Sequence, residues 1–498
     1  MDTVKAINRE LREALSRLVF AESDADLREI LAIAAPAIMI TLLTESCVVL
    51  ALAKARERDL TFVPATASLA ADLAAGRADK SGRIYDLSVQ RFAAANAFNW
   101  RGFARYLAHG FITNRGFKFG RDPVLVVNHN GLLQRTARAD GYQSFRYRSP
   151  GRLYGRATPS IGGGIQKKCQ KLGAAIGDLL KKALLLHGAV PAANHVETLS
   201  RKTGEWLATV AQHRLALDMN WRVRPRDLWT GTGGNYVTRQ LRAAVRRSGG
   251  RVSGFEHGGG GHIHRELGSE VINEFWFADR FVADTATKAT IYQSGAATSG
   301  LMLGPVPEFE GVAPQLASFH WNNGSAGAVK RVLYVTTAFV GESCYPIQPL
   351  MPDPIYADWQ GRLADGLAAQ GFEILIKQHP QGLRRGQPLV TSKKGQYLSG
   401  SFEDAARQAD AFVFDYPATT TLWEAICTEK PVLFVDLGLA DWNPDVRALF
   451  ERRCAVIGGE FDEWNRPHAD FAAMRSALIN APMDDAFATA YLTGQARR

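Results

Sequence analysis

A lysine and a histidine stand at the end of an apolar stretch in the C-terminal third of the chain. The stretch Ile374-Leu-Ile-Lys-Gln-His-Pro380 predicts a buried strand that brings Lys377 and His379 to a sheet edge, where Pro380 prevents a helix from starting. Ligands of open parallel sheets bind at the carboxyl ends of the strands. A cation and a histidine there can hold a phosphate and hydrogen-bond or protonate it as it leaves. The alternative interpretation is a turn that happens to contain His and Pro.

Three consecutive threonines follow a second apolar stretch. Residues 411 to 415 predict a strand ending at Asp415, and Thr419, Thr420 and Thr421 stand where the next helix should begin. Threonine caps helices, which is the purely structural interpretation. The free N–H groups of a helix start, with hydroxyls beside them, also bind anions. Glu424 follows within the first turns, where its carboxylate can accept hydrogen bonds from a ribose.

Four glycines follow a histidine near the middle of the chain. Residues 251 to 257 predict a strand that brings Glu256 and His257 to a sheet edge, and the glycines after it are Gly258, Gly259, Gly260 and Gly261. Glycines let a backbone approach a ligand closely and present its N–H groups to it. We expect this loop to form the wall of an interdomain cleft beside a catalytic base. A plain mobile turn is the alternative.

Two other kinds of site are indicated only weakly. His257, His262 and His264 could ligate zinc, but their spacing fits no common ligand pattern and the cysteines stand elsewhere. The glycines at 231 to 234 only weakly indicate a dinucleotide-binding site. Such a site has an acidic residue at the end of the next strand, and here that residue could only be Glu256, which sits beside a histidine. We therefore expect no metal.

The elements that must position these residues alternate along the chain. In the C-terminal third, strands that are apolar almost throughout are separated by helical patterns, which predicts a doubly wound parallel sheet. A less regular alternation in residues 1 to 300 predicts a second α/β domain. The longest apolar stretch, Ile30 to Ala53, contains Pro36 and Glu45. We expect a strand at 37 to 42 followed by a helix there, rather than a membrane span.

Three regions follow from this pattern. We expect an acceptor-side α/β domain over 1–310 with a basic helical insertion near 160–220, and a Rossmann-like nucleotide-binding domain over 311–460. The segment 300 to 316, rich in Pro and Gly, should connect them. A C-terminal helix over 461–498 should pack back on the first domain.

Composition narrows the class of protein. With 498 residues, 46% hydrophobic and 22% charged, the chain is neither disordered nor fibrous. Its five cysteines show no C-x-x-C spacing, which favours a reducing compartment, and the charged amphipathic start does not read as a secretory signal.

The net charge of +10 is concentrated in three segments, 148 to 156, 167 to 182 and 222 to 247. It favours an acidic partner, either a nucleotide, an anionic glycan or an anionic membrane face, although a basic surface that only maintains solubility is the alternative. Nucleic acid is disfavoured because aromatic residues do not alternate with these charges.

Taken in order, these motifs resemble bacterial surface-polysaccharide transferases of the GT-B fold. The similarity covers residues 225 to 455 and is to the CDP-glycerol glycerophosphotransferases and, more broadly, to the CMP-sugar-dependent sialyl-, polysialyl- and Kdo transferases. The motifs that carry it are the His-Gly loop, LMLGPVP, VLYVTTAF, Lys-x-His-Pro, Asp-Tyr-x-x-Thr-Thr and Lys-Pro. The resemblance implies that His379, Pro380 and the threonines 419 to 421 contact the donor phosphate, and that His257 is the histidine of the first domain. This chain has Asp-Tyr-Pro-Ala-Thr-Thr-Thr where the glycerophosphotransferases usually have Asp-Tyr-Ser-Ser.

The resemblance implies a GT-B fold with two Rossmann-like doubly wound domains facing across a cleft. The expected reaction moves a nonulosonic acid, sialic-acid-like or Kdo, from a CMP donor to a hydroxyl of a bacterial surface glycan or glycoprotein, without metal or cofactor. Lys377, His379 and the threonines would stabilise the leaving phosphate, while His257 or Glu256 removes the acceptor proton. A CDP-glycerol-type polyol phosphate transferase and a non-catalytic sugar-nucleotide-binding protein are the alternatives. We expect a cytoplasmic protein, at the inner face of the membrane, that binds no nucleic acid.

Overall fold

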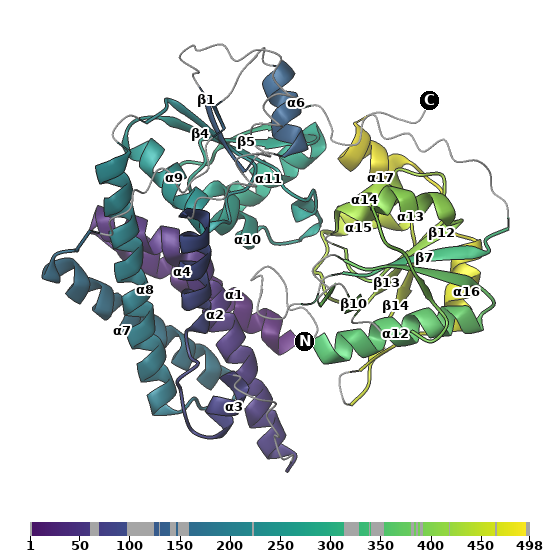
Figure 1. The fold of residues 1–498 in the computed structure, drawn as a ribbon, viewed down its shortest axis with the longest axis horizontal. Helices are drawn as coiled ribbons and strands as arrows, with labels where there is room; N and C mark the ends of the chain where they lie inside the picture. Colours follow the sequence, from purple (N-terminus) through teal and green to yellow (C-terminus); the bar gives the residue numbers. More distant parts are fainter. Residues whose placement is uncertain are drawn as a thin grey trace. The chain divides into compact units, whose positions relative to one another are not determined.

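The computed structural model divides the chain into two compact units (Figure 1). The first unit comprises Met1–Phe255, Gly268–Phe281 and Ala296–Glu308, and the second comprises Glu256–Leu267, Val282–Gly295 and Phe309–Arg498. The structure describes residues 2–59, 69–96, 124–128, 130–139, 146–147, 159–221, 224–312, 328–337, 339, 353–379, 383–384, 387–388, 392–417, 419–463 and 466–494. The basic segment 148 to 156 and Pro380 lie outside these residues.

Most of the first unit is helical. Its helices are α1 (Asp2–Ala21), α2 (Ala25–Glu57), α3 (Leu69–Ala74), α4 (Arg83–Asn96), α6 (Gly131–Ala139), α7 (Gly163–Leu186), α8 (Ala193–Asn220), α9 (Tyr236–Arg247) and α10 (Gly268–Glu270), followed by a π-helical turn, η3 (Val271–Phe275). The basic segment near 160–220 forms α7 and α8, which pack against each other, while α7 also contacts α1 and α8 contacts α2.

The strand that we expected at residues 37 to 42 is wrong, because α2 continues through it as one helix of 33 residues. Asp24 caps this helix by accepting hydrogen bonds from the N–H groups of Asp26 and Leu27. Residues on every side of α2 are buried against α1, α4, α7, α8 and α9, so its sequence lacks the helical periodicity of a half-buried helix. Among the described residues, α2 is the one helix long and apolar enough to cross a membrane. However, 61% of its most apolar window is buried inside the protein.

Glycines allow α7 and α8 to approach each other closely. A Cβ atom on Gly173 would lie 2.3 Å from the carbonyl oxygen of Ser200, and one on Gly177 would lie 1.9 Å from the Ser200 hydroxyl. Gly204 of α8 faces the backbone of Gln170 in the same way. These contacts show that the two helices run antiparallel as a tightly packed hairpin.

The first sheet has the strand order β2-β1-β3-β4-β5-β6. Its strands are β1 (Val124–Val127), β2 (Arg146–Tyr147), β3 (Asp227–Thr230), β4 (Arg251–Phe255), β5 (Arg280–Ala283) and β6 (Glu308–Gly311). The pairs β1–β2, β1–β3 and β3–β4 are parallel. The order reverses between β1 and β3, as in doubly wound sheets. Helix α9 packs on the apolar residues of β1, β3 and β4.

The second sheet, β11-β8-β7-β12-β13-β14, is parallel throughout. Its strands are β7 (Arg331–Val335), β8 (Glu373–Lys377), β11 (Gln396–Tyr397), β12 (Ala411–Phe414), β13 (Val432–Asp436) and β14 (Ala455–Gly458). In chain order this is 3-2-1-4-5-6, the order of dinucleotide-binding Rossmann folds, with the reversal between β7 and β12. The expected α/β class with parallel sheets is confirmed.

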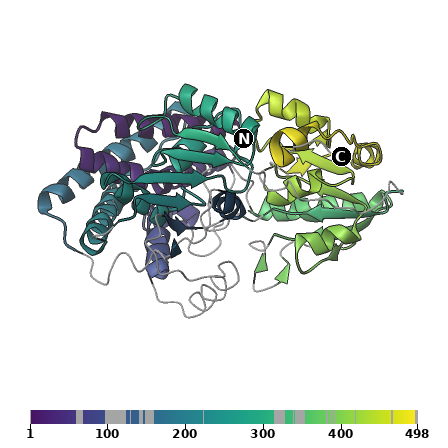
Figure 2. The same cartoon turned by 90° about the horizontal axis from the view of Figure 1, so that it is seen from above.

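Helices cover both faces of the second sheet (Figures 1 and 2). Val332 and Tyr334 of β7 face the core formed with α12 (Asp353–Ala369) and α16 (Phe471–Ile479). Leu333 and Val335 face the opposite core. The elements of that core are α13 (Phe402–Gln408), α14 (Thr420–Ile426), α15 (Pro444–Glu451) and α17 (Ala486–Ala488). The remaining short elements are β9 (Leu383–Arg384) with β10 (Gln387–Pro388), β15 (Glu460–Phe461) with β16 (Pro467–His468), α11 (Ala286–Thr298), η2 (Gly261–Ile263) and η5 (Thr489–Thr493).

The C-terminal tail belongs to the core of the second unit. Phe487 and Tyr491 pack there with Ile263, which the sequence analysis assigned to the first domain. The hydroxyl of Thr285 also donates a hydrogen bond to the carbonyl of Ala490 at 3.0 Å. The tail therefore contacts segments within 1–310, but these segments are part of the second unit because their apolar side chains are buried in its core.

The close packing of α7 on α8 predicts an unusual response to a glycine substitution. Gly→Ala inside a helix normally stabilises it by about 0.5 to 1 kcal/mol. We expect Gly173→Ala to lower the free energy of unfolding by about 1 to 3 kcal/mol, because the new methyl group meets the Ser200 carbonyl. Urea denaturation measures this change. Gly164→Ala, on the same helix with open space around it, is the control and should not destabilise the protein. Equal effects of the two substitutions would contradict the packing.

Candidate functional site

The carboxyl end of β8 carries a lysine and a histidine next to the strand-order reversal. Lys377 pairs with Val335 of β7, and the N–H of Thr336 donates a hydrogen bond to the Lys377 carbonyl at 3.1 Å. The N–H of His379 in turn lies 3.4 Å from the hydroxyl of Thr336. The backbone thus brings Thr336, Lys377 and His379 to one edge of the sheet, at the place where open α/β sheets bind ligands.

The environment of this edge sets the protonation of His379. Burial lowers the pKa of His379, and the positive charge of Lys377 lowers it further, so the imidazole is neutral near pH 7. Between these residues stands Gln378, which is buried. Neither atom of its side-chain amide has a hydrogen-bond partner among the described residues. A buried amide of this kind has unused capacity to hydrogen-bond a ligand.

Asp415, at the end of β12, lies in the interior rather than at the surface of this edge. Its carboxylate accepts hydrogen bonds from the Tyr334 hydroxyl at 2.6 Å, the Tyr356 hydroxyl at 2.7 Å and the Trp359 indole at 3.0 Å. Burial raises the pKa of Asp415 above its usual range, although these hydrogen bonds act in the opposite direction. The geometry gives Asp415 the role of joining β7, β12 and α12 at the reversal point.

The three threonines stand at the start of α14, as expected. Thr419 occupies the N-cap position, but its side chain makes no capping hydrogen bond. Its hydroxyl instead lies 2.9 Å from that of Thr421, while Thr420 is exposed. Glu424 is half-buried one turn later. Burial, with a smaller contribution from the charge of Glu403, raises the pKa of Glu424 to about 7.

A small pocket brings the glycine loop and the threonine helix together within the second unit. Its described lining residues are Gly258, Gly259, Asp284, Lys288, Thr420, Trp423 and Leu492. Gly258 and Gly259 both have positive φ, +73° and +68°, which only glycine adopts readily. The indole N–H of Trp423 is buried and has no hydrogen-bond partner in the described part of the chain. Lys377 and His379 are not among the described lining residues.

A buried ion cluster supports this pocket. The ammonium of Lys288, which is 0% exposed, lies 3.2 Å from Glu256 Oε1, 3.4 Å from Asp284 Oδ2 and 3.1 Å from the Gly259 carbonyl. The Tyr292 hydroxyl donates to the same Glu256 oxygen at 2.7 Å. Burial alone would lower the pKa of Lys288, but Glu256 and Asp284 raise it above its usual range, so the amine stays charged. The cluster fixes the conformation of the glycine loop.

The two residues predicted as a base differ in their surroundings. Glu256 is buried and accepts hydrogen bonds from Lys288, Tyr292 and the Asp284 N–H. His257, the next residue, is exposed. A group that removes a proton from a substrate must reach that substrate, which His257 does more readily than Glu256.

Of the other two histidines of this loop, His262 is buried and His264 is half-buried. His262 packs between aromatic rings, 5.8 Å from Trp423 and 4.9 Å from Tyr491. Burial lowers the pKa of His264 to about 4. Among the described residues, no group of His, Cys, Asp or Glu side chains is arranged to hold a metal ion.

The glycines at 231 to 234 bind a carboxylate of the protein itself. The N–H groups of Gly233 and Gly234 donate hydrogen bonds to Glu274, at 2.5 and 3.3 Å. Arg242, buried beside them, donates to the Glu274 carbonyl at 2.7 Å. The N–H groups that a dinucleotide phosphate would need are therefore already occupied.

Sequence reasoning missed the central part of this site. Asp284 ends strand β5 and Lys288 follows four residues later, so the rule that selected Asp415 and His379 would also have selected Asp284. No comparable signal pointed to Tyr292 or Trp423, which read as ordinary core aromatics.

No protein-family model matches the chain, and no curated protein matches it either. The class that the fold and the site define is an α/β protein with two largely parallel sheets, one of them with Rossmann strand order.

The buried cluster predicts a strong dependence of stability on Lys288. Lys288→Met should lower the free energy of unfolding by about 3 to 5 kcal/mol, because Glu256 and Asp284 lose their buried counter-charge. Adding Glu256→Gln should cost less than the sum of the single effects, with a coupling of about 1 to 3 kcal/mol. Urea denaturation of the four proteins measures this cycle. Lys393→Met, at an exposed site, is the control and should change stability by less than about 0.5 kcal/mol. If the effects of Lys288→Met and Glu256→Gln simply add in the double variant, the two side chains do not interact and the ion cluster is contradicted.

Proposed function

We propose that the protein is a glycosyltransferase of the GT-B class that uses a CMP-activated nonulosonic acid, sialic-acid-like or Kdo, as donor. The observation that carries this proposal is the position of Lys377 and His379 at the carboxyl edge of a sheet with Rossmann strand order, next to its reversal point. The acceptor in this proposal is a hydroxyl of a bacterial surface glycan or glycoprotein.

The residues of this edge suit a leaving nucleotide. When the glycosidic bond breaks, the CMP phosphate gains negative charge, which the ammonium of Lys377 attracts. His379, neutral before binding, can donate one hydrogen bond to the phosphate, and its pKa would rise as the anion approaches. The hydroxyl of Thr336 and the exposed hydroxyl of Thr420 offer further donors. This chemistry requires no metal in the proposed mechanism.

For the acceptor side, the exposure of His257 favours it over Glu256 as the base. Glu256 then acts through Lys288, which holds the Gly259 carbonyl and so the loop that follows His257. The basic composition of the chain supports an anionic acceptor. We place the reaction in the cytoplasm, at the inner face of the membrane.

A thermal-shift panel tests the donor. CMP at a hundredfold excess over its Kd should stabilise the folded protein by about 2.7 kcal/mol, while UMP, GMP and AMP at the same concentration should give smaller shifts. His379→Ala should lose most of the CMP shift without a change in the unliganded melting temperature. His468→Ala, an exposed histidine of the same unit, is the matched control and should keep the shift.

The same panel separates the alternatives. A larger shift with CDP than with CMP would favour a CDP-glycerol-type polyol phosphate transferase. A preference for a uridine nucleotide would overturn the donor assignment, and a full CMP shift in His379→Ala would overturn the role of His379. CMP binding without sugar transfer would leave a sugar-nucleotide-binding protein.

A further inference from the structure

The tip of the α7–α8 hairpin presents large aliphatic side chains to solvent. Leu186 is 75% exposed, Val190 is 76% exposed and Leu185 is 48% exposed. Single exposed apolar residues are common on protein surfaces, but here three lie within six residues of one turn. We call residues 181 to 190 the hairpin tip.

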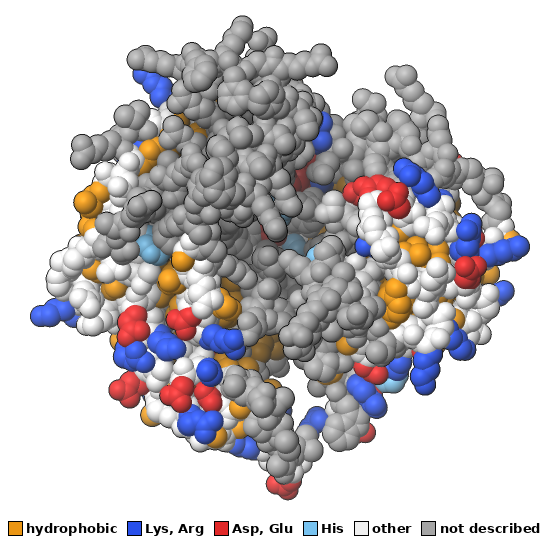
Figure 3. Space-filling model, viewed as in Figure 1, with side chains coloured by type: hydrophobic (Ala, Val, Ile, Leu, Met, Phe, Trp, Pro, Cys, Tyr) orange, Lys and Arg blue, Asp and Glu red, His pale blue; other side chains and the backbone are white. Residues whose placement is uncertain are grey.

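Lysines border these apolar side chains. Lys181 and Lys182 are exposed and precede Leu185 and Leu186 by one helical turn, so they lie on the same side of α7. Lys167 and Lys171 continue the basic character toward the start of α7, in which Asp178 is the one acidic residue, while Lys168 pairs with Asp24 at 2.8 Å. At the lower left of the face seen in Figure 3, acidic and basic side chains of the first unit lie side by side.

The hairpin tip is held in a defined conformation. The N–H groups of Gly188 and Ala189 donate hydrogen bonds to the carbonyls of Leu185 and Leu184, at 3.2 and 2.9 Å. The ring of His187 lies 3.2 Å from Glu10 of α1, which ties the tip to a neighbouring helix.

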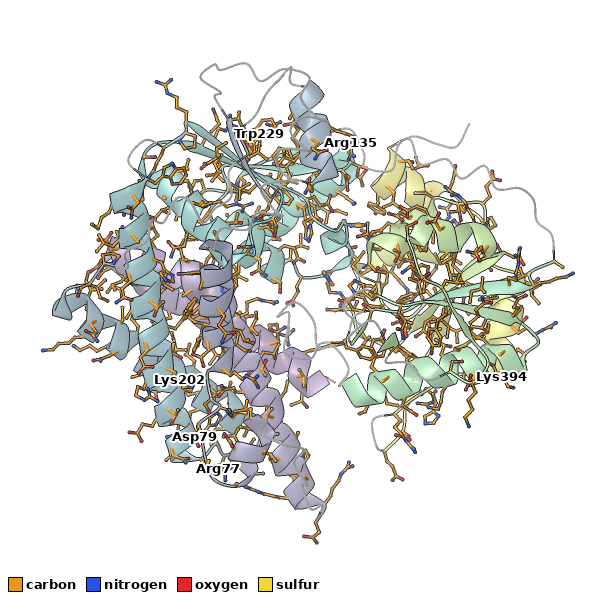
Figure 4. The ribbon with its side chains drawn as sticks, viewed as in Figure 1. Arg77, Asp79, Arg135, Lys202, Trp229 and Lys394 are labelled. Atoms are coloured by element: carbon orange, nitrogen blue, oxygen red, sulfur yellow. The ribbon has the colours of Figure 1, made fainter. Side chains whose placement is uncertain are left out.

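The start of α8 is also anchored. Asn194 donates a hydrogen bond to the Gly76 carbonyl at 2.8 Å, and Lys202 to the Asp79 carbonyl at 3.3 Å (Figure 4). The apolar side chains are therefore exposed by a fixed turn and not by a loosely packed one.

We infer that the hairpin tip is a docking surface for an anionic lipid bilayer. Aliphatic side chains at an exposed turn can enter the headgroup region, while the ammonium groups one turn behind them reach lipid phosphates. Stable attachment of a peripheral protein requires both kinds of contact, and the tip supplies both. This inference is independent of the proposed reaction and of α2, whose apolar side chains are largely buried.

Vesicle flotation of the full-length protein tests the inference. Wild-type protein should float with vesicles of equal parts phosphatidylcholine and phosphatidylglycerol, and much less with phosphatidylcholine alone. Lys181→Gln with Lys182→Gln should weaken binding to the anionic vesicles about 25-fold, since each lysine contributes about fivefold. Leu186→Ser with Val190→Ser should weaken it about tenfold or more.

Matched variants of the second unit are the controls. Lys393→Gln with Lys394→Gln removes an exposed lysine pair, and Ile479→Ser with Met483→Ser removes exposed apolar side chains (Figure 4 labels Lys394). Both should bind vesicles like the wild type. Circular dichroism shows whether each variant is folded. Failure of the wild type to bind anionic vesicles, as expected if the tip contacts an acidic protein instead, would overturn the inference. Equal losses in tip and control variants would overturn it as well.

Discussion

The ammonium of Lys288 is the contact on which the glycine loop depends. It is fully buried, and its hydrogen bonds join two carboxylates and the Gly259 carbonyl. A buried charge is tolerated only when it is paired and hydrogen-bonded, so the loop, the end of β5 and the start of α11 must keep their relative positions. The positive φ angles at Gly258 and Gly259 follow from this constraint, since the backbone must turn to bring a carbonyl to the ammonium.

A second constraint acts on the parallel sheet of the same unit. The buried carboxylate of Asp415 accepts three hydrogen bonds from β7 and α12, at the point where the strand order reverses. This arrangement stabilises the sheet edge on which Thr336, Lys377 and His379 stand. Interior side chains thus fix the backbone on which the half-buried side chains of Lys377 and His379 stand.

The sequence predicted the elements with clear patterns and failed where burial removes them. Strands such as β7, β8, β12 and β13 are short, apolar and separated by helices, so their parallel arrangement could be inferred. Helix α2 is apolar on all sides because helices surround it, and part of it was therefore mistaken for a strand. Within the candidate site, the sequence pattern identified the residues at the ends of strands, but it did not identify the residues that hydrogen-bond to Glu256. Lys288 and Tyr292 come from α11, and only the fold shows which helix meets which loop.

We propose that the donor nucleotide binds at the carboxyl edge of the second sheet. A crystal structure of the protein with CMP tests it most directly. We expect density for the CMP phosphate within hydrogen-bonding distance of Lys377 and His379, at the carboxyl end of β8. CMP bound instead at the carboxyl ends of β1 and β3, with the edge at β8 empty, would contradict it.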